Sequence, residues 1–165
     1  MKKYFWFFLI VSFSANAINP IQLFTVQRSK NKNEVRYELR VDDNCKPLGK
    51  EPVHGYWQEL EKGPDVKLEI EGLDILAYGI SYQKVNGDMV KFKVKAIKDR
   101  EYSAKLFKKE NTCYAEATTK INGKDAILKK VYIFSVEKFL KVKVKYIDLI
   151  GVLPDGSAIQ ERMNF

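Results

Sequence analysis

The sequence predicts a mainly β protein: an antiparallel β-sandwich or barrel-like single domain with one short helix, preceded by a signal peptide. Three features predict this fold class. Apolar and polar residues alternate with a period of two, Asn-Gly pairs mark tight turns between the alternating runs, and no run has the spacing of a βαβ unit.

The first 17 residues have the order of a secretory signal. Lys2 and Lys3 precede an apolar run over residues 4–11, and Ala15 and Ala17 occupy the small-residue positions that a signal peptidase reads. The run is shorter than the roughly 20 apolar residues of a membrane span. We expect cleavage after Ala17 and an exported chain, periplasmic or extracellular. An N-terminal anchor that stays uncleaved is the alternative.

Cleavage leaves 165 − 17 = 148 residues, 18–165, which suit one domain with its own core. The full chain has a net charge of +8, and loss of the two signal lysines leaves +8 − 2 = +6. We therefore expect a basic domain that does not span the membrane. Export also removes nucleic acid as the usual partner of a basic surface, so no nucleic-acid partner is expected.

Alternation places apolar residues on one face of each expected strand and charged residues on the other. In the run 34–41, for example, Val35 and Tyr37 oppose Arg36 and Glu38. A further strand should end near residue 85, and the others are expected at 23–28, 34–41, 53–58, 89–98, 101–107, 112–121, 124–136 and 139–146.

Two tight turns predict hairpins. Asn86-Gly87-Asp88 and Asn122-Gly123 can take the positive φ angles that short hairpin loops require. Residues 65–78 fit both a strand and a helix pattern. We favour a short helix there, because Gly79 suits a helix C-terminus.

Only two cysteines are present, Cys45 and Cys113. In an oxidising compartment an even cysteine count favours a disulfide over two free thiols. The bridge would span 113 − 45 = 68 residues. Two isolated cysteines and one histidine, His54, lack the paired ligand spacing of a zinc site, so no metal and no cofactor are expected.

Four segments together resemble a known family: LFTVQRSKN at 23–31, EPVHGYW at 51–57, AYG at 77–79 and VKYIDLIG at 144–151. The resemblance is to the family catalogued as domain of unknown function 4833, and it extends from residue 23 to about residue 162. Members of that family are mostly exported bacterial proteins. The resemblance thus supports the compartment and the domain boundaries, and it implies no activity, cofactor or catalytic residue.

A catalytic set is hard to find in the residues themselves. His54 is the only histidine, so a Ser-His-Asp arrangement would have to use it, with Ser29 and Asp148 as the nearest candidates in the family segments. The chain has no G-x-S-x-G turn and no glycine-rich phosphate loop. We therefore favour an ordinary strand histidine over a catalytic one.

Lysines alternate with apolar residues in two of the expected strands, at positions 91, 93 and 95 and at positions 141, 143 and 145. Such a row could attract an anionic component of the cell envelope or an acidic partner protein through its field. The alternative is that outward lysines only keep strands soluble and prevent edge-to-edge pairing.

Aromatic residues are abundant, and a sandwich or barrel of this size can enclose one small ligand. The alternative is that these rings pack the core. Combining the family segments with the first lysine row gives the binding candidates: Arg28, His54, Tyr56, Trp57, Tyr78, Lys91, Lys93, Lys95, Tyr146 and Asp148.

Asp148 continues the alternation that places Val144 and Tyr146 on one face, so it should point to the apolar side. A buried carboxylate needs a partner, and an arginine can engage both of its oxygens. Arg28 is the first candidate and Arg100 the second. Alternatively, a bulge or strand end near residue 147 reverses the register and exposes Asp148.

The sequence therefore predicts an exported, non-catalytic binding domain that acts on an anionic envelope component or on a partner protein. The alternative function is that of a cell-envelope hydrolase that uses Asp148 or His54.

Overall fold

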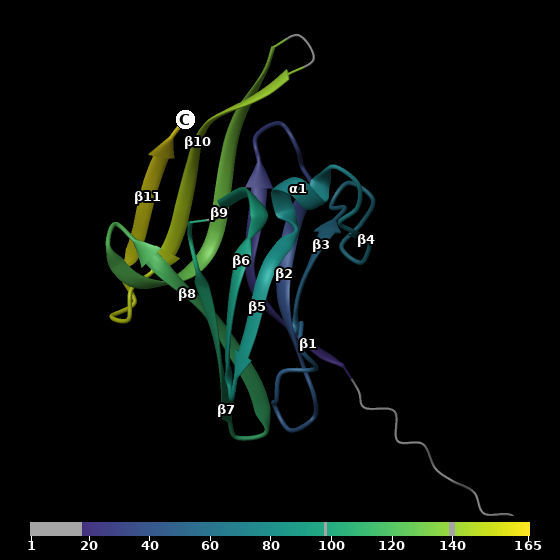
Figure 1. Cartoon of the computed structure of the whole chain (residues 1–165), viewed down its shortest axis with the longest axis vertical. Helices are drawn as coiled ribbons and strands as arrows, with labels where there is room; N and C mark the ends of the chain where they lie inside the picture. The colour runs from purple at the N-terminus through teal and green to yellow at the C-terminus, as the bar shows by residue number, and fades with distance from the viewer. Residues whose placement is uncertain (1–17, 98, 139–140) are drawn as a thin grey trace, which may run out of the picture.

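The computed structural model describes residues 18–97, 99–138 and 141–165, so the predicted signal peptide lies outside the described part of the chain. The prediction of a mainly β fold with one short helix is confirmed (Figure 1). The elements are β1 Asn19–Arg28, β2 Glu34–Val41, β3 Val53–Gln58, β4 Lys67–Glu69, α1 Asp74–Tyr78, β5 Ile80–Asn86, β6 Met89–Val94, the 3₁₀ helix η1 Lys95–Ile97, β7 Tyr102–Lys109, β8 Thr112–Ile121, β9 Lys124–Lys138, β10 Lys141–Val152 and β11 Ala158–Asn164.

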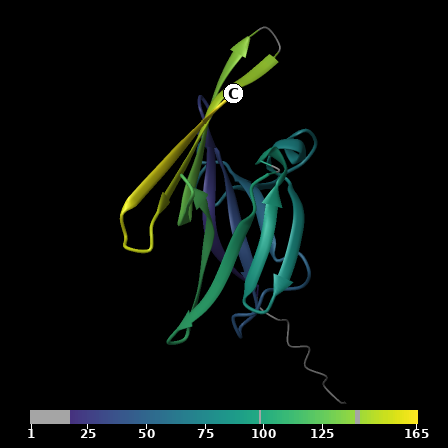
Figure 2. The ribbon, with the colours of Figure 1, turned by 60° about the vertical axis from the view of Figure 1, so that its left-hand side comes forward.

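The described strands form one 11-stranded sheet that branches at β9. Its order is β4-β3-β2-β1-β9-β8-β7-β6-β5, with β10 paired to β9 and β11 paired to β10. Residues 124–127 of β9 pair with β8, and residues 130–133 pair in parallel with β1. The sheet therefore divides into a first arm, β1–β4, and a second arm, β5–β8, while β9, β10 and β11 form a ribbon beside them (Figure 2).

Aromatic rings fill the space between the two arms. The Phe24 ring of the first arm lies 4.7 Å from Tyr37 and 5.5 Å from Tyr102 of the second arm. Phe92 stacks on Tyr102 at 5.4 Å, and all four side chains are almost fully buried. The arms therefore pack face to face, as in a sandwich, although they belong to one continuous sheet.

The predicted turns and the ambiguous segment are both resolved. Asn122 and Gly123 take positive φ angles of 48° and 75°, as the predicted hairpin turn requires. Within residues 65–78, both patterns are used: β4 takes the strand part and α1 the helical part. Gly79 follows α1 as predicted, but with an extended conformation rather than a left-handed one.

One strand prediction needs correction, and one strand was not predicted. The strand predicted at 89–98 ends at Val94, because the chain turns into η1, where Ile97 packs beside Tyr78 and the Lys95 N–H donates to the Gly79 carbonyl at 2.9 Å. Lys95 is therefore not part of the strand row, and residue 98 is not described. The strand that was not predicted is β11, which pairs antiparallel with β10 along seven positions.

The predicted disulfide is present between Cys45 and Cys113, whose Cα atoms lie 5.5 Å apart. It joins the loop between β2 and β3 to the start of β8, and so links the two arms. Among the described residues, no helix has both the length and the apolar composition needed to cross a bilayer.

Candidate functional site

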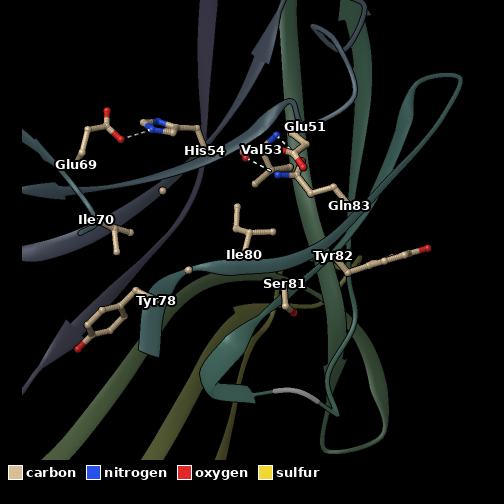
Figure 3. Close-up of a pocket in the computed structure, with 12 residues that line it drawn as sticks. Glu51, Val53, His54, Glu69, Ile70, Tyr78, Ile80, Ser81, Tyr82 and Gln83 are labelled. Atoms are coloured by element: carbon tan, nitrogen blue, oxygen red, sulfur yellow. Dashed lines mark hydrogen bonds and ion pairs between the residues drawn. The ribbon is translucent and has the colours of Figure 1, made fainter. Parts of the chain in front are cut away.

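A pocket of about 280 Å³ opens between the edges of β3 and β5 (Figure 3). It receives residues from two of the segments that carried the family resemblance, 51–57 and 77–79. The lining residues are Glu51, Val53, His54, Gly55, Glu69, Ile70, Tyr78, Gly79, Ile80, Ser81, Tyr82 and Gln83.

Gly55 helps to keep the pocket open. A Cβ at this position would lie 3.0 Å from Cε1 of Tyr37 and 3.1 Å from Cδ1 of Ile70. Since Tyr37 is fully buried in the core, a side chain at residue 55 would have to displace a packed ring or fill the pocket. A side chain at this position would crowd Tyr37 and Ile70, so glycine suits this part of the pocket wall.

The side-chain amide of Gln83 bridges β5 to β3. Its Oε1 accepts from the Val53 N–H at 2.9 Å, and its Nε2 donates to the Val53 carbonyl at 2.8 Å. These paired bonds resemble those of a peptide group in a sheet, and they hold the strand edges together at one side of the pocket (Figure 3).

His54 lies between two carboxylates. Its Nε2 is 2.8 Å from Oε2 of Glu69 on β4, and its Nδ1 is 3.5 Å from Oε1 of Glu38 on β2. Glu38 raises the pKa of His54, burial opposes the rise, and Glu69 adds to it. Burial would raise the pKa of Glu38, but His54, Lys67 and Arg40 together outweigh burial and lower it. The charged pair is therefore favoured at mildly acidic pH.

Tyr56 and Lys67 flank this cluster. The ring of Tyr56 lies 6.0 Å from the His54 ring, and the Lys67 ammonium stands 4.3 Å from the centre of the Tyr56 ring. Lys67 Nζ is also 3.7 Å from Oε2 of Glu38. The short edge strand β4 is thus attached to β3 by charge and ring contacts as well as by its backbone pairing.

Tyr78, Trp57 and Arg28 come together at the end of α1. The Tyr78 ring meets the Trp57 ring edge-on at 5.2 Å, and Trp57 Nε1 donates to Oδ2 of Asp74 at 3.1 Å. Burial raises the pKa of Tyr78, whereas Arg28, which hydrogen-bonds to it, opposes the rise. Tyr37 also donates its hydroxyl to the Tyr78 carbonyl at 2.6 Å. These contacts fix α1 against both β1 and β3.

Asp148 is buried and paired with an arginine, but not with either predicted one. Arg162, directly opposite on β11, donates from Nε and Nη2 to the two carboxylate oxygens, each at 2.7 Å. Arg28 instead contacts Tyr78, and Arg100 contacts Glu161 at 3.4 Å. The Asp148 side chain is only 6% exposed, while that of Arg162 is 49% exposed, so the pair forms the outer surface of the ribbon.

The face of Asp148 also differs from the expectation. A register shift between Val144 and Tyr146 moves Ile147 and Leu149 into the core. Tyr146 and Asp148 share a face as predicted, but that face is the outer one. Burial of the carboxylate comes from the covering arginine, whose guanidinium lies 3.8 Å from the Tyr146 ring, which in turn stacks on Phe134 at 4.9 Å.

Asp148 and His54 are far apart. They lie on β10 and β3, with β2, β1 and β9 between them. Four strand spacings amount to roughly 19 Å. Ser29, the predicted serine partner, donates its hydroxyl to the Ser135 carbonyl at 3.1 Å. The three residues therefore do not form a triad.

The lysine row extends across three strands of the second arm. One face of β6 packs on the core through the buried residues Val90, Phe92 and Val94, and Lys91 and Lys93 lie on its other face. Lys84 of β5 is directly opposite Lys91, and Lys105 of β7 is opposite Met89 on the same face. Lys91 Nζ also lies 2.9 Å from Glu101. We call the face formed by Lys84, Lys91, Lys93 and Lys105 the lysine face; Lys93 is partly exposed and the other three are exposed.

Several residues of these sites were not anticipated. Glu38 and Glu69 alternate with apolar residues and so looked like solvent-facing strand residues; only the pairing of β2, β3 and β4 places them around His54. Gln83 lies on β5, and only the packing of the two arms brings its amide to Val53. Lys84 was overlooked because, for its strand, only the end near residue 85 was predicted. In the part of the chain that the structure describes, no three His, Cys, Asp or Glu side chains form a group that could hold a metal ion.

Comparisons with known proteins identify a family without adding a function. No curated protein and no solved structure matched the chain. The family model described as "Domain of unknown function (DUF4833)" matches residues 24–162, which include both the pocket and the lysine face. The chain therefore belongs to the family of domain of unknown function 4833.

Proposed function

We propose that this domain is exported and binds an anionic component of the cell envelope through the lysine face. The observation that carries the proposal is the direct opposition of Lys84 and Lys91 on adjacent strands, with the exposed Lys105 and the partly exposed Lys93 on the same face. Compatible with export are the signal-like N-terminus and the disulfide.

Like charges directly opposite each other destabilise a sheet. Glu101 and Glu116 offset part of the positive charge, since Glu101 contacts Lys91 and Glu116 is opposite Lys105. Among the described residues, no carboxylate forms an ion pair with Lys84, Lys93 or Lys105. Phosphate or carboxylate groups bound across the face would relieve this repulsion. A ligand that carries several such groups could contact several of these lysines at once.

The hydrolase alternative gains less support from the geometry. Both oxygens of Asp148 bind Arg162, and His54 contacts two carboxylates rather than a nucleophile. The separation of Asp148 from His54 also prevents them from acting on one bond.

Vesicle sedimentation tests the proposal. The mature protein should bind vesicles that contain an anionic phospholipid, and it should bind vesicles of neutral lipid far less. Binding should weaken as salt rises, because the Debye length falls to about 8 Å at physiological ionic strength. Replacing Lys84, Lys91 and Lys93 together by Gln should reduce binding by about tenfold or more, since each lysine near an anionic surface contributes about 1 kcal/mol.

A matched variant separates the lysine face from net charge. Replacing Lys30, Lys46 and Lys50 by Gln removes the same charge from exposed turns and loops outside the face, and it should leave most of the binding intact. Equal losses in the two triple variants, or no binding by the wild type at low salt, would contradict the proposal.

Mass spectrometry of the exported protein should give Ile18 as its first residue, and retention of Met1 would contradict export by cleavage.

A further inference from the structure

We infer that the anionic component bound by the lysine face is a linear polysaccharide that carries acidic sugars. The inference rests on the proposed function, because the acidic groups would contact the same lysines. It adds the recognition of sugar rings, for which exposed aromatic side chains and a neighbouring cleft are suited.

Exposed aromatic rings gather on and beside the lysine face. Most aromatic side chains of the described residues are buried or partly buried, and four are exposed. Tyr82 is opposite Lys93, and Phe107 and Tyr114 are opposite each other on β7 and β8. The fourth, Phe165, lines a cleft that adjoins this face. Aromatic exposure is therefore concentrated on one side of the molecule.

Phe107 and Tyr114 share the face of the lysines. The residues of β7 that alternate with Phe107 are buried, so Phe107 lies on the outer face together with Lys105 and the exposed Lys109. The two rings stack with their centres 5.6 Å apart, and each residue is 41% exposed. A sugar ring has an apolar face of C–H groups that can pack on such rings, while acidic groups along its chain would contact the neighbouring lysines.

The rings lie at both ends of the lysine face, with lysines between them. Tyr82 is opposite Lys93, which is two residues from Lys91. Lys91 is opposite Ser103, and Phe107 follows Ser103 by four residues. Six residues of extended chain thus separate the two levels, which is roughly 20 Å along the strands. A ligand that contacts both ends must therefore consist of several sugars, and its separate contacts would reinforce one another.

A cleft of about 700 Å³ adjoins the lysine face where the end of the ribbon meets the second arm. Ser103, which is opposite Lys91, and Thr118, which is opposite Ser103, both line this cleft. Met163 and Phe165 give it an apolar wall. The volume is within the range of ligand sites. Hydroxyl groups beside an apolar wall suit a sugar ring, which has hydroxyls at its edge and C–H groups on its faces.

The charges that line the cleft are largely paired within the protein. Three of its four acidic side chains form ion pairs, at 2.9, 3.1 and 3.4 Å: Glu101 with Lys91, Asp125 with Lys120 and Glu161 with Arg100. The cleft should therefore receive a neutral part of the ligand, while acidic parts bind the lysines. Because a flat bilayer cannot fill a cleft, this concave surface favours a polysaccharide over a membrane surface.

Isothermal titration of the disulfide-bonded mature protein tests the inference with three probes. A hyaluronan oligosaccharide, in which acidic and neutral sugars alternate, should bind, and its affinity should rise with length until the chain spans roughly 20 Å. The methyl ester of the same oligosaccharide lacks the charge, and polyglutamate of equal charge lacks the sugar rings. Each of these two should bind at least about tenfold more weakly. Polyglutamate that binds as tightly as the oligosaccharide would overturn the inference.

Two variants and one control locate the sugar chain. Phe107→Thr removes one ring of the stacked pair, keeps a residue that favours strands, and should weaken oligosaccharide binding about fivefold. Phe134→Thr is the matched control, because Phe134 also stacks on a ring across the strands, Tyr146 at 4.9 Å, but lies on the ribbon. It should leave binding unchanged. Thr118→Val removes only the hydroxyl in the cleft and should weaken binding about threefold.

Vesicle binding separates this inference from the proposed function. Phe107→Thr and Thr118→Val should change vesicle binding by less than about twofold, and circular dichroism verifies that each variant is folded. Equal losses of vesicle and oligosaccharide binding in Phe107→Thr would show that the rings contact a membrane, which overturns the inference and leaves the proposed function intact. If neither vesicles nor any of the polyanions binds at low salt, the proposed function fails as well.

Discussion

At the scale of single residues, Asp148 shows how a buried charge is accommodated at a surface. Arg162 lowers the pKa of Asp148 by two hydrogen bonds, although burial opposes this effect. A carboxyl group whose pKa is lowered by folding contributes stability above its unfolded pKa, and this stability is lost as the pH falls through the folded value. Because Arg162 is half exposed, solvent screens the pair, and its contribution is that of a surface ion pair.

Asp148→Asn should therefore lower the free energy of unfolding by about 1 kcal/mol at neutral pH. The difference from wild type should shrink as the pH falls from neutral to below about 3.9, the usual pKa of an aspartate in an unfolded chain, because protonation of the wild-type carboxyl removes its stabilising effect. Asp125→Asn is the matched control, because Asp125 pairs with Lys120 while 79% exposed, and its loss should cost almost nothing. Urea unfolding at both pH values measures these effects, and equal losses in the two variants at neutral pH would refute the structural role of Asp148.

The sequence predicted a buried Asp148 with an arginine partner but named the wrong arginine. The partner lies on β11, where Ile159, Glu161 and Met163 alternate with more exposed residues. A turn signal at 154–157 precedes that strand, and extending the hairpin from β10 would have placed Arg162 opposite Asp148. The turn and the alternation were both present in the sequence. The alternation of this edge strand is weak, however, because few of its residues are strongly apolar.

At the scale of elements, close contact between β9 and β10 depends on Gly151. A Cβ there would lie 2.6 Å from the Ile127 carbonyl oxygen and 2.7 Å from Cδ1 of Ile121. Gly151→Ala should therefore cost about 1–3 kcal/mol through overpacking, because a backbone atom in the middle of a sheet cannot move aside. Gly55→Ala should cost less, since its closest neighbours are side-chain atoms at 3.0 and 3.1 Å. Denaturant midpoints give the order, and a larger loss in Gly55→Ala would contradict it.

Strand bounds were predicted well where a strand has one buried face along its whole length. They were predicted poorly where a tertiary contact ends the strand. The strand 34–41 was predicted with the bounds that β2 has. The strand from residue 89 continued its alternation in sequence through Ala96, yet contact of η1 with α1 ends it at Val94. Such a contact joins segments that the local pattern treats independently, so sequence periodicity cannot indicate where the strand stops.

At the scale of the whole molecule, the fold class was predictable but the branching of the sheet was not. A period of two identifies strands and their buried faces without naming their neighbours. The 15-residue strand β9 pairs with β8 through one part and with β1 through the next, in the one parallel pairing of the described strands. The pocket depends on this topology, because the edges of β3 and β5 meet only when the two arms fold against each other.

The disulfide between Cys45 and Cys113 links those two arms across a sequence separation of 68 residues. Its chief effect should be to limit the conformational freedom of the unfolded chain. For a loop of this length, this loss of chain entropy stabilises the folded state by about 4 kcal/mol. Replacing both cysteines by Ala should therefore lower the denaturant midpoint strongly. The circular dichroism spectrum should stay that of the wild type, because the rings of Phe24, Phe92 and Tyr102 still join the arms. Reducing the wild type should produce the same loss as the double substitution. If the oxidised wild type and the double variant unfold at the same denaturant concentration, the bridge does not stabilise the domain, and the shared aromatic core alone must hold the arms together.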